Sequence, residues 1–283
     1  MLRQLTGSID AWTANGIRYP LAALLYWPIL WAFYRTGQIG WRSIAACLVP
    51  AGLAFAAQVL WAWAPYYLPA SAIGFFARLS LAWALLAAML LFADERKLLS
   101  VFGFYAGLLL SIVGFVIMSV SKGFLDADVT PLGVAIISLC SVFFGLYAVT
   151  VRWFLRGIHA LAAFGIVSNI VSLGTLTFMF LLGDLTDLAE MPVSDWILLC
   201  SSSVVGIAVG HVLMYTSVQR LGATIPSAIG TLTPFVTVFF AGIFLGESLS
   251  PLEWGGGLAM VIGALILLTK QQHVLRQPAE PRG

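Results

Sequence analysis

Long apolar runs separated by short polar connections constrain this chain more than any other feature of its sequence. A bilayer core about 30 Å thick needs about 20 apolar residues per helix, and a helix satisfies its own backbone hydrogen bonds in lipid. The pattern therefore predicts an all-α membrane protein, a polytopic helix bundle with about nine helices. The expected spans are Ile17–Phe33, Ser43–Trp63, Pro69–Phe92, Leu98–Val120, Pro131–Val151, Ala160–Leu182, Asp195–Gln219, Thr224–Leu245 and Glu253–Leu268.

Composition supports this class and excludes others. Charged residues make up only 9% of the chain, with 14 Lys and Arg and 12 Asp and Glu, whereas a soluble domain carries about a quarter. The net charge of +2 does not suggest a nucleic-acid partner. The three cysteines lie in apolar runs and the three histidines are dispersed, so neither residue type suggests a metal or redox site. We therefore expect no cofactor and no metal.

Basic residues are divided unequally between the two sides of the membrane that these spans define. The first side holds Arg3, Arg18 and Lys122. The second side holds Arg35, Arg42, Arg96, Lys97, Arg152, Arg156, Arg220, Lys270, Arg276 and Arg282. Because cytoplasmic loops carry the excess of basic residues, the second side and the C-terminus are predicted to be cytoplasmic. The stretch Met1–Gly16 lacks the apolar core of a signal peptide.

Two stretches, Pro69–Arg78 and Ile225–Pro234, resemble each other at an offset of 156 residues. Both contain a loose Ser-Ala-Ile-Gly pattern, and each is followed by one further apolar run. The two copies lie on opposite sides in the predicted topology. Such an arrangement is the sequence mark of the inverted repeats of many secondary transporters.

The second half of the chain resembles the drug/metabolite transporter superfamily, in its EamA-like family. The residues that carry the resemblance are Gly222–Pro234, Leu245–Glu247, Glu253–Gly257 and Ile262–Gly263. The resemblance implies two inverted repeats of the ten-helix drug/metabolite transporter type. It assigns residues 1–125 to a first EamA-like repeat that lacks its first helix, 131–270 to a second repeat and 271–283 to a cytoplasmic tail. The first copy departs from the pattern, since Arg78-Leu-Ser stands near where the second has Thr233-Pro234.

Polar side chains within the spans are the candidate substrate-binding residues, because an unpaired polar group costs free energy in lipid. Arg78 is the only formal charge that this topology places well inside a span, where it either faces the interior or snorkels to the interface. Gln58 and His211 occupy equivalent positions in the two repeats, and they either join helices or contact substrate. Asn169 has the same two interpretations, and packing hydrogen bonds are favoured.

The segment around Pro234 is a different kind of candidate. A proline inside a helix frees the carbonyl four residues earlier, here Gly230, and a neighbour or water must satisfy it. Thr231, Thr233 and Pro234 therefore mark either a bend beside a cavity or a plain kink. Glu247 is expected at the outer interface, where capping or gating is favoured over substrate binding.

Aromatic side chains either line a pocket or form interfacial belts, and Trp61, Tyr147 and Tyr215 are candidates for a pocket. The same alternatives apply to Trp27, Trp63, Tyr66 and Tyr67, with the belt favoured for the last two. Gly255–Gly257 and Gly263 give small faces for close helix packing.

By resemblance, the chain is a secondary transporter, and an exporter, of a small organic metabolite such as an amino acid or other carboxylate-bearing solute. The alternative is a non-transporting membrane subunit or receptor. A membrane enzyme is not expected, because the spans contain no paired carboxylates, no His-Glu-x-x-His and no Gly-x-Ser-x-Gly. With no Asp or Glu inside a span, His211 is the only titratable candidate near neutral pH, and we predict weak proton dependence.

The expected location is a bacterial-type cytoplasmic (inner) membrane. The expected partners are a small-molecule substrate and the lipid bilayer, and a homodimer is left open.

Overall fold

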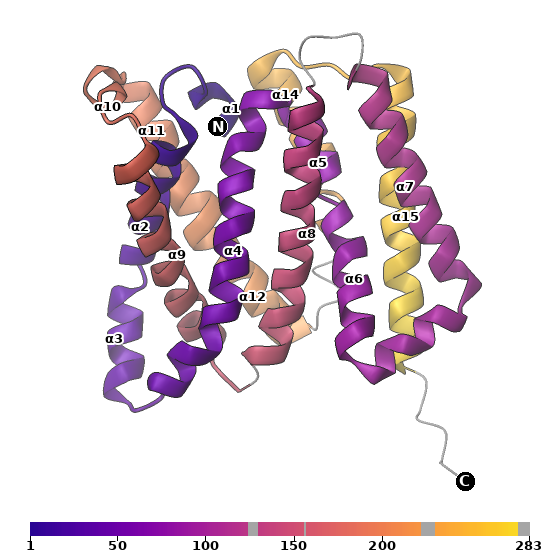
Figure 1. Ribbon diagram of the computed structural model, residues 1–283, viewed down its shortest axis with the longest axis horizontal. Helices are drawn as coiled ribbons and strands as arrows, with labels where there is room; N and C mark the ends of the chain where they lie inside the picture. The colour runs from indigo at the N-terminus through magenta and orange to yellow at the C-terminus, as the bar shows by residue number, and fades with distance from the viewer. Residues whose placement is uncertain (124–129, 156, 222–229, 277–283) are drawn as a thin grey trace.

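The computed structural model describes residues 1–123, 130–155, 157–221 and 230–276, and every regular element among them is a helix (Figure 1). Six helices in these ranges are long and apolar enough to cross a membrane: Trp41–Tyr67, Ala70–Leu91, Pro131–Phe154, Ala160–Leu182, Val193–Thr216 and Pro251–His273. Two shorter apolar helices cover Phe102–Met118 and Thr233–Leu245. The prediction of a polytopic, all-helical membrane protein is confirmed.

Local chemistry sets the starts of the helices in the first half of the chain. The Asp10 carboxylate accepts hydrogen bonds from the backbone N–H groups of Trp12 (2.8 Å) and Thr13 (3.1 Å), which caps the second helix. Pro28 lies in the first turn of the third helix, where its missing N–H costs nothing. The helices are α1 (Leu2–Leu5), α2 (Ala11–Leu24), α3 (Trp27–Arg35), α4 (Trp41–Tyr67), α5 (Ala70–Phe76), α6 (Leu79–Leu91), the 3-10 helix η1 (Ala93–Ser100) and α7 (Phe102–Gly123).

Capping also starts helices in the second half. Ser250 and Glu253 form a reciprocal capping box, in which the Ser250 N–H donates to Glu253 Oε2 (2.6 Å) and the Glu253 N–H donates to Ser250 Oγ (3.3 Å). The elements are α8 (Pro131–Phe154), α9 (Ala160–Leu182), α10 (Asp187–Glu190), α11 (Val193–Ser201), the π-helix η2 (Ser202–Val209), α12 (Gly210–Leu221), α14 (Thr233–Leu245) and α15 (Pro251–Arg276). The α11, η2 and α12 segments follow one another without a break.

Eight of the nine predicted spans correspond to an apolar helix in the described part of the chain. The span predicted from Thr224 is described only from residue 230, because residues 222–229 lie outside the described ranges. Pro234 lies in the first turn of α14, so it starts a helix and does not kink one. The first predicted span, Ile17–Phe33, is not one helix. It is divided between α2, which ends at Leu24, and α3, which begins at Trp27, and neither is long and apolar enough to count among the membrane-spanning helices.

The helices α7 and α15 lie side by side (Figure 1), and glycines let them approach closely. A Cβ atom added to Gly114 would lie 2.5 Å from the Gly256 carbonyl oxygen. A Cβ at Gly257 or Gly263 would also lie within 2.6 Å of a neighbouring atom, whereas Gly255 has no atom within 4 Å. The close packing predicted for this glycine group is therefore confirmed except at Gly255.

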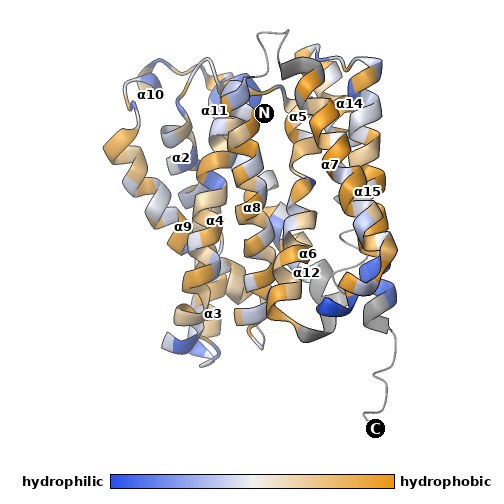
Figure 2. Ribbon diagram, turned by 45° about the vertical axis from the view of Figure 1, so that its right-hand side comes forward, coloured by the Kyte–Doolittle hydropathy of each residue, from blue (hydrophilic) through white to orange (hydrophobic). Residues whose placement is uncertain are grey.

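Hydrophobic residues line the lengths of the helices, and hydrophilic residues gather toward the two ends of the bundle (Figure 2). Large apolar side chains such as Leu90, Phe102 and Leu181 point outward, with exposed fractions above 70%. An outer surface of this kind suits lipid. Helix α10 and the N-terminus lie at one end, and the C-terminal end of α3 lies at the other (Figure 1).

Candidate functional site

Arg78 lies in the turn between α5 and α6, and its Nη1 donates a 2.7 Å hydrogen bond to the carbonyl oxygen of Gly230. Gly230 directly precedes the turn Thr231–Leu232, which leads into α14. Because Pro234 has no N–H, it cannot bond to the carbonyl four residues before it, and Arg78 uses that acceptor. The prediction that a neighbour satisfies Gly230 is confirmed. Arg78 Nε is buried and has no hydrogen-bond partner among the described residues.

A carboxylate ties the outer end of α5 to the end of α14. Glu247 Oε1 accepts from the Ala70 N–H (2.9 Å) and Oε2 accepts from the Ser71 N–H (2.8 Å), so Glu247 caps α5 from a distant part of the chain. Gly246 has a φ of 67°, in the left-handed region, and this turns the chain at the end of α14. The expected capping role of Glu247 is confirmed.

Three predicted candidates line one small pocket at the centre of the bundle. Gln58 from α4, Tyr147 from α8 and His211 from α12 surround it together with Tyr19 from α2, so both halves of the chain contribute. The pocket has a volume of about 10 Å³, which is about the space of one water molecule. The described conformation is therefore closed around its polar centre.

Hydrogen bonds orient the polar groups around this pocket. His211 Nδ1 lies 3.1 Å from the Ile207 carbonyl oxygen; a carbonyl only accepts, so Nδ1 carries the proton and Nε2 of a neutral ring is an acceptor. The His211 ring stacks on Phe164 with ring centroids 5.1 Å apart. The hydroxyls of Tyr147 and Tyr215 are hydrogen-bonded to each other, which joins α8 to α12.

Arg18 was expected on the external side, at the start of the first span, and the structure corrects this expectation. The residue lies inside α2 and is only 5% exposed. Its Nε donates to Ser202 Oγ (2.8 Å) and its Nη1 to Asn15 Oδ1 (3.3 Å), while Ser203 Oγ donates to the Arg18 carbonyl. These bonds connect α2 to the π-helix η2. Arg18 is consequently a second arginine within the bundle, besides Arg78.

A sequence signal for Arg18 was present. Asp10 is a good N-cap, and a helix that starts there places Asn15, Arg18 and Tyr19 on one face, at spacings of three and four residues.

The remaining candidates lie apart from the central pocket. Asn169 faces the outside of α9, where its Oδ1 accepts from Trp27 Nε1 (2.9 Å) and its Nδ2 donates to the Gly165 carbonyl (2.8 Å). It therefore makes the favoured packing bonds. Trp61 packs edge-to-face against Phe144, a pocket residue, with centroids 5.9 Å apart. Thr231 is buried beside the Arg78 contact, whereas Thr233 is exposed at the start of α14.

Further polar bonds join the two halves at the outer end of α2. The Asp184 N–H donates to Asp10 Oδ2 (3.0 Å), and Ser8 Oγ donates to Asp195. The Thr186 hydroxyl and N–H donate to Asp184, and these bonds lower the pKa of its carboxyl below the ordinary value. At this end of the bundle the first and second halves are thus tied by hydrogen bonds. Among the residues searched, no group of three His, Cys, Asp or Glu side chains is suited to a metal ion.

The fold and these buried polar contacts define an integral membrane protein built as a multi-helix bundle. Residues 131–269 match the model of the EamA-like transporter family. Over 78 residues the chain is 36% identical to the "Uncharacterized transporter YcbK" of Bacillus subtilis (strain 168). That alignment covers 28% of this chain and 23% of the relative, so less than a quarter of the relative is matched.

The fold of this chain is similar to that of another protein known from a crystal structure. That structure superimposes with a TM-score of 0.63 and covers 94% of this chain and 90% of the other. The sequence identity is 14%, so this likeness concerns the fold alone.

Proposed function

We propose that this protein is a secondary transporter that moves a small organic solute across a membrane by alternating access between two inverted repeats, residues 1–125 and 131–270. The match of residues 131–269 to a transporter family supports this proposal. So does the small polar pocket to which both halves contribute. Export, a location in a bacterial-type inner membrane and a cytoplasmic C-terminus rest on the family resemblance and the charge distribution.

The single observation that carries the proposal is the contact between Arg78 and Gly230. The contact joins the turn that separates α5 from α6 to the turn that precedes α14. Interrupted helices that meet inside a membrane bundle are the usual setting for transporter binding sites, because their free backbone groups and buried charges can contact a polar solute. A bundle that served only as a scaffold would not need a charge at this position.

The chemistry of Arg78 supports an anionic or carboxylate-bearing solute. An arginine inside a membrane helix costs about 2.5–3.5 kcal/mol on insertion scales. Toward the described residues, Arg78 makes one hydrogen bond, from Nη1 to Gly230. A guanidinium can bind a carboxylate through two parallel hydrogen bonds. We infer that an amino acid or another carboxylate occupies the remaining donors when the bundle opens.

The closed pocket and the hydrogen bonds at the outer end of α2 fit one conformation of an alternating cycle. In this interpretation the bonds of Asp184 to Asp10 and of Asp195 to Ser8 close the external side. Opening of the bundle would then enlarge the space near Gln58, Tyr147 and His211.

Counterflow in proteoliposomes tests the proposal. Purified protein is reconstituted, the vesicles are loaded with an unlabelled solute, and entry of the labelled solute is followed for amino acids, nucleosides and carboxylates. We expect saturable entry of at least one carboxylate-bearing solute and none into protein-free vesicles. If no solute enters although one of them raises the unfolding temperature, the protein binds without transport and the receptor alternative replaces this proposal.

A further inference from the structure

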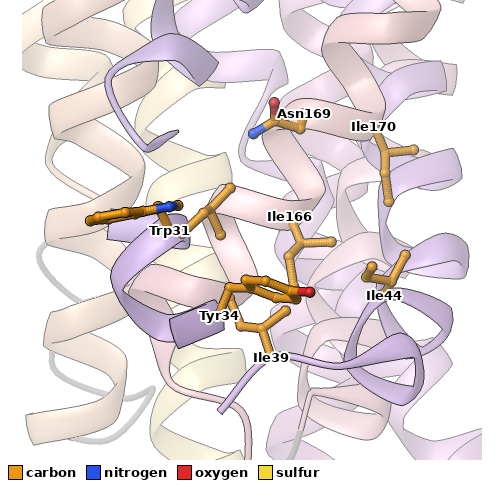
Figure 3. Close-up of a pocket in the computed structure, with 8 residues that line it drawn as sticks. Trp31, Tyr34, Ile39, Ile44, Ile166, Asn169 and Ile170 are labelled. Carbon is orange, nitrogen blue, oxygen red and sulfur yellow. The ribbon is translucent and has the colours of Figure 1, made fainter. Parts of the chain in front are cut away.

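A groove on the outer surface of the bundle lies apart from the central pocket (Figure 3). Its volume is about 410 Å³, and it runs between α3, the start of α4 and α9. The lining is almost wholly apolar and includes Leu30, Tyr34, Ile44, Ile166 and Ile170. A groove of this kind on a membrane-facing surface is open to the lipid phase.

The depth of the groove matches one leaflet. Asn169 marks its inner end, and the loop after α3, with Ile39, marks its outer end (Figure 3). Asn169 is nine residues from the first residue of α9, and at about 1.5 Å per residue this is about 14 Å. Half of the hydrocarbon core is about 15 Å. One acyl chain of a phospholipid would therefore reach from the interface to the end of the groove.

Positive charge is concentrated where a lipid headgroup would lie. The guanidinium carbon of Arg35 is 3.9 Å from the centroid of the Trp31 ring, and Trp31 also lines the groove. Arg42, on the first turn of α4, is exposed two residues before Ile44. The connection from residue 35 to residue 44 contains no Asp or Glu. A phosphate is the natural partner of two exposed arginines beside an apolar groove.

We propose that this groove binds one anionic phospholipid, with an acyl chain against Ile166 and Ile170 and its phosphate bonded to Arg35 and Arg42. The charge distinguishes this occupant from a neutral lipid. The groove is only as deep as one leaflet, so it suits a lipid acyl chain better than a partner helix that spans the whole membrane. The site does not depend on transport, since it lies on the opposite side of α9 from the pocket residues.

Native mass spectrometry tests this assignment on the full chain released from nanodiscs of phosphatidylcholine and phosphatidylglycerol in equal amounts. We expect one retained phosphatidylglycerol per chain, with a preference of about tenfold over phosphatidylcholine. The double variant Arg35→Gln, Arg42→Gln should lose the preference but still retain lipid. Ile166→Trp, which fills the groove, should lose the retained lipid of either kind.

Two controls make the result specific. Arg96→Gln removes an exposed arginine that bonds to the Met89 and Leu90 carbonyls, and Leu173→Trp enlarges an outward side chain of α9 that is 70% exposed. Both should retain phosphatidylglycerol as the unaltered protein does. If Ile166→Trp does not fold, Ile44→Phe provides the same test. Equal retention of both lipids by the unaltered protein, or unchanged retention in the arginine and groove variants, would overturn the proposal, as would a second copy of the chain bound in place of lipid.

Discussion

Arg78 and Gly230 are 152 positions apart in the chain and are joined by a 2.7 Å hydrogen bond inside the bundle. The sequence explains both sides of this contact. The chain turns at Thr231–Leu232 after Gly230, so the Gly230 carbonyl is free to accept from another segment, and Arg78 is a buried cation that needs an acceptor. Each residue offsets the free-energy cost of the other, and together they join the two halves of the chain where α5 ends and α14 begins.

The cap that Glu247 places on α5 should contribute to stability. In Glu247→Gln the amide keeps one acceptor oxygen but loses the second acceptor and the negative charge, which interacts favourably with the N-terminus of a helix. We expect a loss of about 1 kcal/mol, seen as a lower unfolding temperature in detergent. Glu190→Gln, at an exposed position on α10, is the control and should unfold as the unaltered protein does. Equal unfolding temperatures for both variants would mean that the cap contributes nothing.

The packing of α7 on α15 predicts opposite results for two glycines. Gly114→Ala would put a methyl group 2.5 Å from the Gly256 carbonyl oxygen and force the helices apart, with an expected cost of about 1–3 kcal/mol. Gly255→Ala meets no atom within 4 Å and should be neutral or stabilising, because alanine favours a helix. Thermal unfolding of both variants in the same detergent measures the difference. Similar behaviour would show that the helices do not touch at Gly114.

Proton coupling should be weak. The carboxylates on the membrane helices, Asp195 and Glu253, lie in the first turns of α11 and α15, not at mid-depth. We therefore expect uptake to change less than about twofold between about pH 6 and pH 8, and His211, which lines the pocket, is the histidine to test. Uptake into vesicles with an imposed pH gradient provides the measurement. Strong pH-driven uptake that persists in His211→Gln would contradict this reasoning.

The sequence predicted the spans well because hydrophobicity alone determines which segments lie in lipid. It failed at Arg18, which it placed at the external start of the first span, because the buried partner Ser202 is 184 residues away in the chain. It also grouped Asn169 with the central residues, although only the packing of α9 decides which of its faces points inward. The convergence of Gln58, Tyr147 and His211 depends on how three separate helices pack, and composition does not encode that arrangement.

The most direct test of the central claim is uptake of labelled carboxylates into proteoliposomes by Arg78→Lys and Arg78→Leu. A lysine keeps the charge but cannot bind a carboxylate through two parallel bonds. Loss of a charged hydrogen bond costs about 1.5–3 kcal/mol, or about 10- to 100-fold. We predict a loss of this size for the lysine variant and no uptake for the leucine variant, with normal insertion of both and unchanged uptake by Arg96→Lys. Full uptake by Arg78→Leu would contradict the account.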